Sequence, residues 1–449
     1  MIIEPHLWPV FDHLPVDWGT FGRYSRRGWY FSDRGESHRR YGPMWAIVTP
    51  VDVYINIADS EAIHDIFQRR TDFIRPSKMY KVLEVYGPCI STASWTDWPR
   101  HRKVLATPFN ENIMSFVWDE SLEQSSQMLD IWAAPDINQI PSIAKDTRTL
   151  SLNVLAATGF RKSYPFRSAN GRQEEKNQET ANYRDALQTV LDNCILLMIA
   201  PRKMLTLSFA PKRWHILAKA ADDFKHYMVR MLNEETKALN EGKTGSGGLM
   251  TSFVHAMDLR QKEDTMKATD KSPRKGLTSI TVTKGRYAEL FPRLTRCKAV
   301  MLKTLRHFPP IPSLPKWTSD QLQALRVGEK TVIIPPSVGI NPSILTMHIH
   351  PQHWEDPLAW KPSRWVTISK EVDAATTMNT RKSSLRPVVE FVAVMANLFH
   401  DHRICAIQNA GETPEQTRER ILATTRDVDL QLLLRMRDAD QVRLMCKRM

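Results

Sequence analysis

The sequence has few cysteines, and no two of them lie close together. Its five cysteines form no Cys-x-x-Cys pair, and their number is odd. A disulfide framework or a structural zinc site needs cysteines at paired, short spacings, so the sequence predicts neither. A small number of cysteines without paired spacings is typical of a protein in a reducing compartment. The five are Cys89, Cys194, Cys297, Cys405 and Cys446.

Long hydrophobic runs are also missing. The longest, such as CILLMIA at 194–200, fall well short of the ~18–20 apolar residues that a helix needs to cross a bilayer. The first residues, MIIEPHLWPVF, contain an early Glu and Pro and no continuous apolar core. The sequence therefore predicts neither a transmembrane helix nor a signal peptide, and it contains no internal repeats.

Positive charge is in excess but is not concentrated. The formal net charge is +13, from 62 Lys and Arg against 49 Asp and Glu. Such a charge favours acidic partners, whether a protein, an anionic membrane surface, a small ligand or nucleic acid. Because the basic residues are scattered, an ordinary basic surface explains them equally well, and nucleic-acid binding is not expected.

Composition and pattern indicate a mainly α fold with a small β-rich lobe. A chain of 449 residues with 42% hydrophobic content can bury a large core, either as one large domain or as two or three. Alternating β-branched residues predict a hairpin at 45–58, and a capped helix follows at 59–73. Helices are predicted at 98–134, 143–160, 178–240 and 287–310, a strand pair at 328–340, a last helix at 389–399 and a strand-like end at 431–444.

Two stretches lose this pattern. Residues 241–286 contain the loop EGKTGSGG and a highly charged segment, which predict a flexible linker. Residues 366–388 are polar and irregular.

Five segments, taken in order, resemble one family. They are WPRHRKVLATPFNE at 98–111, AVMLKTLRHFPPIP at 299–312, TVIIPPSVGINPS at 331–343, HPQHWEDPLAWKPSRW at 350–365 and VEFVAVMANLFHDHRI at 389–404. The set resembles a fungal cytochrome P-450, a haem-thiolate monooxygenase of the kind used in secondary metabolism. The ordered set is far more specific than any one segment, and it implies a single cytochrome P-450-like domain over residues 1–449.

The resemblance also implies a cofactor and partners. Family members bind haem and insert oxygen into small lipophilic molecules, with electrons from NADPH delivered by a cytochrome reductase. They are usually anchored in the endoplasmic reticulum membrane, and no anchor is found in this sequence, so a cytoplasmic or peripheral location is also compatible. Three departures from the family count against haem binding by this chain.

Trp98 and Arg102 match the family at the start of the first segment. They are four residues apart, so a helix places the indole N–H and the guanidinium on one face. Together these donors suit a carboxylate, and the resemblance implies that they bind a haem propionate. The alternative is a core tryptophan beside an ordinary surface arginine.

The first departure lies in the second segment, where the family has Glu-x-x-Arg and this chain has Lys303 and Arg306. In the family the Glu-Arg pair joins a second arginine, which matches Arg364 here. Three cations would then meet without an anion, and breaking such a buried ion network costs roughly 3–5 kcal/mol. The alternative is that Lys303 extends along its own stem to solvent.

The second departure is a missing helix. In the family a long central helix, which carries the oxygen-activating residues, lies between a segment like KGLT, here 275–278, and one like YAELFPRL, which begins here at Tyr287. At ~1.5 Å per residue the intervening residues span only about 13 Å, too little for a helix that crosses a domain.

The third departure concerns the iron ligand. The family's cysteine precedes the helix of the fifth segment in a Gly-rich loop, and the expected spacing from Phe391 leads to Arg381. No cysteine occurs between Cys297 and Cys405. A guanidinium has no lone pair to donate, and thiolate donation is what favours O–O cleavage in this family. No intact catalytic residue and no metal ligand is therefore predicted.

Three histidines in the fourth segment are candidate metal ligands. His348, His350 and His353 lie close together in sequence. The matching family segment is also rich in His and Pro and forms a turn near the haem edge, so a turn is the preferred interpretation.

The departures leave three interpretations. The chain is a haem-binding enzyme, a catalytically inactive paralogue, or a mis-spliced or mispredicted gene product that acts, if at all, as a binding scaffold. Family-like sequence resumes in mid-helix at 386–389, which favours a splicing or prediction error over gradual drift.

Overall fold

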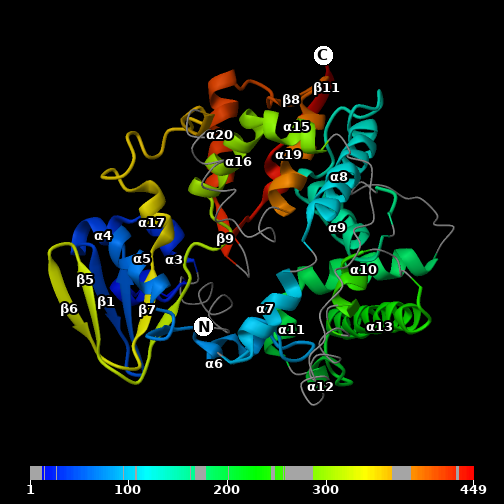
Figure 1. Cartoon of the computed structure of the whole chain (residues 1–449). Coiled ribbons are helices and arrows are strands. Elements are labelled where there is room, and N and C mark those ends of the chain that lie inside the picture. The colour runs from blue at the N-terminus through cyan, green and yellow to red at the C-terminus, as the bar shows by residue number, and fades with distance from the viewer. Residues whose placement is uncertain are drawn as a thin grey trace. The chain divides into compact units, whose positions relative to one another are not determined.

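The computed structural model describes most of the chain (Figure 1). The described residues are 13–14, 16–26, 28–94, 96–106, 109–161, 163–166, 178–200, 202–243, 248–255, 257, 287–366, 386–430 and 434–449. Most of the predicted linker at 241–286, nearly all of 366–388 and the expected ligand position Arg381 lie outside these residues.

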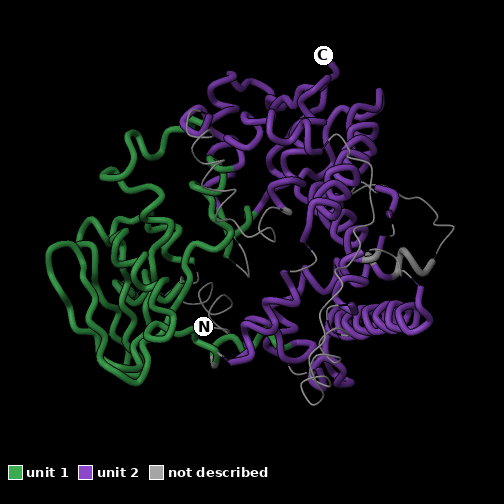
Figure 2. The backbone as a smooth tube through the Cα atoms, viewed as in Figure 1, with its two compact units in different colours: residues 1–84, 302–362, 428–437 green, residues 85–301, 363–427, 438–449 purple. Residues whose placement is uncertain are grey.

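The chain forms two compact units, each made of three separate segments (Figure 2). Unit 1 contains Met1–Glu84, Leu302–Pro362 and Val428–Arg437, and unit 2 contains Val85–Met301, Ser363–Asp427 and Asp438–Met449. The expectation of one domain over residues 1–449 stays a prediction.

Unit 1 contains the predicted β-rich lobe. Its five-stranded sheet has the order β1-β2-β7-β4-β3. The hairpin predicted at 45–58 is confirmed, since β1 and β2 pair antiparallel, and β2 pairs parallel with β7. The strands are β1 Met44–Val48, β2 Val53–Ile57, β3 Phe73–Ile74, β4 Lys316–Thr318 and β7 Gly339–Pro342.

The predicted pairing within 328–340 is wrong. Strand β6, Lys330–Ile334, pairs with the preceding β5, Gln323–Val327, and β7 pairs with β2 and β4. Gly328, with φ +60°, adopts the left-handed conformation that a tight hairpin turn needs. Two prolines, Pro335 and Pro336, follow β6 directly. A proline has no N–H to donate to a neighbouring strand, so these residues do not form a second hairpin with β6.

One helix of unit 1 begins where the sequence predicts a cap. Helix α5, Ser60–Gln68, starts after Asp59, whose carboxylate accepts from the Ala62 N–H at 2.8 Å. Ile66 on this helix is fully buried against Phe73 and the sheet. The other short helices are α2 Gly19–Tyr24, α3 Trp29–Asp33, α4 Glu36–Tyr41, α6 Ser77–Tyr80 and α17 Ile344–Ile349, with a 3-10 turn at Lys81–Leu83.

Unit 2 is mainly helical, as the periodicity predicts. Helices α8 and α19 form its main core, where Trp118, Trp132 and Val392 are at most 1% exposed. Asn397 of α19 donates to the Ser125 hydroxyl of α8 at 2.9 Å, which fixes the register of the two helices. The helices are α7 Trp98–Ala106, α8 Glu111–Trp132, α9 Ile143–Phe160, α10 Gln178–Asp192, α11 Cys194–Ile199, α12 Arg202–Leu205, α13 Lys212–Asn240, α15 Tyr287–Arg293, α19 Arg386–Leu398 and α20 Pro414–Arg426. Helix α16, Thr295–His307, contributes residues to both units.

The C-terminal part differs from the prediction. The helix expected at 389–399 begins at Arg386 and is not the last, because α20 follows it. The stretch predicted to be strand-like, 431–444, contributes to two separate strand pairs. Strand β9, Val428–Leu430, pairs with β10, Leu434–Met436. Strand β11, Leu444–Arg448, pairs with β8, His402–Ala406. A short 3-10 turn, Ala439–Gln441, separates β10 from β11.

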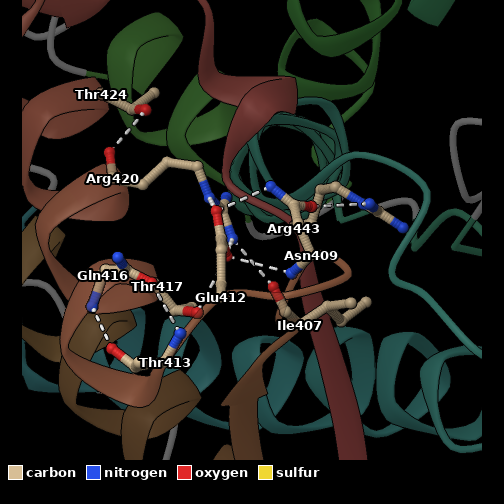
Figure 3. A network of polar contacts seen from close by, with 9 residues as sticks. All are labelled: Ile407, Asn409, Glu412, Thr413, Gln416, Thr417, Arg420, Thr424 and Arg443. Carbon is tan, nitrogen blue, oxygen red and sulfur yellow. Dashed lines mark hydrogen bonds and ion pairs between the residues drawn. The ribbon is translucent and has the colours of Figure 1, made fainter.

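The start of α20 is held by a polar network around Glu412 (Figure 3). The carboxylate accepts from the Asn409 backbone N–H at 3.0 Å and from the Arg420 Nε at 2.8 Å. The Thr417 hydroxyl donates to it at 2.9 Å, and Arg420 also donates to the Ile407 carbonyl. These donors, with Arg420 first, lower the pKa of Glu412 to about 2.

Among the helices that the structure describes, none combines the length and the apolar character that a membrane span requires.

Candidate cofactor site

Helix α7 brings Trp98 and Arg102 together. The Trp98 backbone N–H donates to the Ser94 carbonyl at 2.9 Å, so the helical turn begins just before the tryptophan. The Arg102 guanidinium carbon lies 5.3 Å from the centre of the Trp98 ring. Both side chains are half-buried, and the propionate-binding role of the pair stays a prediction. The shared face predicted from their spacing is present, with two N–H donor groups on it.

Lys303 does not reach solvent. The lysine is 0% exposed, so the alternative in which it extends along its stem to water is wrong. Ala299, Lys303 and Arg306 lie four and three residues apart on α16 and are all buried, which makes one continuous inner face of the helix. Both cations therefore lie on the buried face of α16.

Arg306 binds one backbone carbonyl of α17 and one of the segment that follows it. Its guanidinium donates to the carbonyl oxygens of His348 and Pro357 and contacts the His307 Nε2 at 2.7 Å. It also lies over the ring of Trp354, with 4.4 Å from the guanidinium carbon to the ring centre. Two carbonyl oxygens and an aromatic face thus contact the Arg306 cation.

Trp354 is itself held in place. Its indole Nε1 donates to the Met347 carbonyl at 3.1 Å, and its backbone N–H donates to the His350 carbonyl at 3.1 Å. Trp354 was not among the residues predicted from the sequence. It lies 48 residues after Arg306, so no local spacing signals their contact.

Arg364 is half-buried and belongs to unit 2, whereas Lys303 and Arg306 belong to unit 1. That Lys303, Arg306 and Arg364 lie close together stays a prediction.

The segment that contains His350 and His353 forms a turn, which is the interpretation preferred from the sequence. The His353 backbone N–H donates to the His350 carbonyl at 3.1 Å, and the two rings are 5.7 Å apart. Burial lowers the pKa of His348 and of His350, which favours neutral rings at pH 7. Among the described residues no group of three or more His, Cys, Asp or Glu side chains is arranged to hold a metal.

Two of the five cysteines have a raised thiol pKa. Cys297 packs beside the main core of unit 2, and burial raises its pKa. Burial, and then the neighbouring Cys405, raise the pKa of Cys446. A raised pKa disfavours the thiolate that iron ligation needs. Trp98 and Arg102 thus offer N–H donors that suit a carboxylate edge of a haem, whereas the raised pKa values of Cys297 and Cys446 do not suit these two thiols as iron ligands.

Comparison with known proteins identifies the family. The profile described as cytochrome P-450 matches residues 17–281, which is more than half of the chain. A cytochrome P-450 monooxygenase of Arthrobotrys oligospora is 22% identical over 535 residues, covering 99% of this chain and 90% of the relative. Another, from Postia placenta, is 26% identical and covers 82% of this chain and 79% of the relative.

Solved structures agree on the fold. The haem domain of cytochrome P-450DA matches with a TM-score of 0.62 at 12% identity, covering 96% of this chain and 94% of that one. Cyanobacterial CYP120A1 with bound retinoic acid matches with a TM-score of 0.59 at 14% identity, covering 93% and 94%. The chain belongs to the cytochrome P-450 family.

Proposed function

We propose that this chain is a cytochrome P-450 that does not carry out monooxygenation in the form given by its sequence. In the family, thiolate-bound haem supplies the oxygen activation. The observation that carries the proposal is the absence of any cysteine between Cys297 and Cys405. The position expected for the ligand is occupied by Arg381, which has no lone pair to donate.

Three further observations support this proposal. The pKa values of Cys297 and Cys446 are raised, so these thiols are poor sources of a thiolate. The family profile stops matching at residue 281, just after the KGLT segment that precedes the expected central helix. The alignment with the Arthrobotrys relative, at 535 residues, is longer than this chain of 449, so the relative has residues that this chain lacks.

The carboxylate-binding part of the site is retained in this proposal. Trp98 and Arg102 share one face of α7, and their N–H donors would hold an anionic edge of the cofactor. Lys303, Arg306 and Arg364 would form the structural set that the family builds around a glutamate. Residues 1–449 would form one domain, with 241–286 and 366–388 at the two places where family segments are missing.

A second candidate is that the sequence represents an altered gene product of an active monooxygenase. The observation that favours it is the intact α19, which packs in the main core of unit 2 although the sequence before it departs from the family. The complete protein would bind haem and oxidise a small lipophilic substrate with an NADPH-dependent reductase, at the endoplasmic reticulum membrane or peripheral to it. Genomic DNA around codons 278–286 and 366–388 tests this candidate. In-frame sequence for a helix and a Gly-rich cysteine loop would support it, and its absence would leave the inactive paralogue.

Haem content and ligation test the first proposal. The purified chain is mixed with haem, and bound haem is measured after gel filtration together with the difference spectrum of the reduced carbon monoxide complex. We expect no thiolate-type Soret band. Stoichiometric haem with such a band would contradict the proposal. Serine substitution of each cysteine in turn would then identify the ligand.

A further inference from the structure

Strands β8 and β11 form an antiparallel ribbon of two strands within unit 2 (Figure 1). Successive residues of a strand point to opposite faces, so the ribbon has an inner face and an outer face. On the inner face Ile404, Leu444 and Cys446 pack against the main core of unit 2. The core therefore holds the ribbon in place, and the outer face carries the side chains that alternate with these three.

The outer face carries two cations side by side. Arg403 is directly opposite Lys447 in the register, and both residues are exposed. Like charges at opposite positions destabilise a strand pair. In the part of the chain that the structure describes, neither cation takes part in an ion pair, and the acid next to the ribbon, Asp401, pairs with His400 at 2.7 Å. The outer face therefore has positive charge that an acidic partner could neutralise.

The second edge of β8 has no neighbouring strand. Among the described strands, β8 pairs with β11 alone. At one end of the ribbon the Ile407 N–H donates to the Arg443 carbonyl at 3.0 Å, and at the other end the Met449 N–H donates to the Asp401 carbonyl at 2.9 Å. Odd-numbered residues of β8 thus bond to β11, and the backbone groups of the even-numbered residues point to the second edge. No described residue bonds to those groups, which belong to His402, Ile404 and Ala406.

An antiparallel strand added at this edge would place a side chain beside Arg403. Because Arg403 turns its own N–H and C=O toward β11, it would form a non-hydrogen-bonded pair with a residue of the added strand. Side chains are closest at such positions, with Cβ atoms about 4.5–5.5 Å apart. An acidic residue there would pair with Arg403 and offset its repulsion from Lys447. A second copy of β8 would instead bring another arginine and histidine, so charge selects an acidic strand over self-association.

We propose that the second edge of β8 binds an extended acidic segment of a partner protein as a third strand. Main-chain hydrogen bonds to the even-numbered residues of β8 supply the affinity in this mode of recognition. Arg403 and Lys447 select a segment whose acidic side chains alternate, so that they all lie on the outer face. The proposal needs neither haem nor an iron ligand, so it stands or fails independently of the proposed function.

Fluorescence polarisation tests the proposal, with the full chain added to a labelled peptide of alternating Val and Glu at pH 7. We expect saturable binding, and about tenfold weaker binding when Arg403 and Lys447 are both changed to Gln, because charge-assisted contacts are lost. A peptide with Lys in place of Glu should not bind, since it would add cations to the outer face. A Glu peptide with a central proline should also fail, because proline cannot donate to a strand.

Matched variants separate the edge from general charge. Arg326→Gln removes an exposed arginine of β5, which belongs to another two-stranded sheet, and it should leave peptide binding unchanged. Ala406→Pro removes an N–H of the second edge but none of the bonds between β8 and β11, so it should abolish binding without changing the circular dichroism spectrum. Cys405 lies next to Arg403 on the outer face, so bound peptide should slow its alkylation, measured by mass spectrometry, while that of Cys89 is unchanged.

Three results would overturn the proposal. They are no saturable binding of the Glu peptide, equal binding of the Lys peptide, and equal loss with Arg326→Gln. If Ala406→Pro alters the spectrum, protection of Cys405 carries the test, and an unprotected Cys405 with bound peptide would place the peptide elsewhere. A final arm uses a single-stranded oligouridylate, and its binding without binding of the Glu peptide would replace the acidic segment by a nucleic acid.

Discussion

The guanidinium carbon of Arg306 lies 4.4 Å from the centre of the Trp354 ring. The arginine comes from α16 and the tryptophan from the segment after α17, and Arg306 also donates to the carbonyls of His348 and Pro357. One buried cation thus links α16 to a segment that has no regular structure of its own. These contacts hold the segment after α17 against α16.

Replacing Trp354 with Ala should therefore destabilise unit 1. We expect a loss of about 2 kcal/mol in the free energy of unfolding, from lost apolar contact and a lost cation–π contact. Urea denaturation followed by circular dichroism measures it. Trp360→Ala is the matched control, because that side chain is 53% exposed and its loss should cost much less. Equal losses in the two variants would show that the stacking on Arg306 contributes nothing.

Acid should weaken the turn before α20 through Glu412. The pKa of this carboxyl is about 2 in the folded chain, against an ordinary value of 4.5, because Arg420 and the Asn409 backbone N–H favour its charged form. A lowered pKa contributes stability above pH 4.5, and that contribution is lost as the pH falls toward 2. Glu412→Gln should reduce stability at pH 6 and converge with the unchanged chain near pH 2. Urea midpoints across this range measure the difference, and a constant difference would exclude titration of Glu412 as its source.

The sequence predicted the elements best where local signals agree. Asp59 caps α5 as expected, because an Asp before an apolar period is both a cap and a start signal. Helix α20 was missed, although Thr413 and Gln416 form a capping box, because its residues lack a strong apolar period. The predicted pair within 328–340 failed because a pairing partner is chosen by the turn, here at Gly328, rather than by strand propensity.

The candidate site was predicted only in part, for a similar reason. The four-residue spacing of Trp98 and Arg102 determines their shared face, so that contact could be foreseen. The burial of Lys303 depends on what packs over α16, and an isolated lysine in an apolar run is ordinarily expected to reach water. A cavity of unit 1 is lined by residues such as Trp29 and Leu430, which are about 400 positions apart in the sequence, so no local pattern could indicate it.

The carboxylate-binding role of α7 can be tested without iron. Metal-free protoporphyrin carries both propionates but needs no axial ligand, so its binding reports on Trp98 and Arg102 whether or not the chain ligates iron. We expect Arg102→Gln to weaken binding about tenfold, through the loss of a charge-assisted hydrogen bond, in a fluorescence titration. The dimethyl ester of the same porphyrin has no free carboxylate and should not distinguish the variant from the unchanged chain. Arg100→Gln is the matched control, since Arg100 lies on the same helix but its side chain is 58% exposed, near Asp97. If Arg100→Gln weakens binding as much as Arg102→Gln, the two donors of α7 do not form a carboxylate site, and the effect is one of general positive charge.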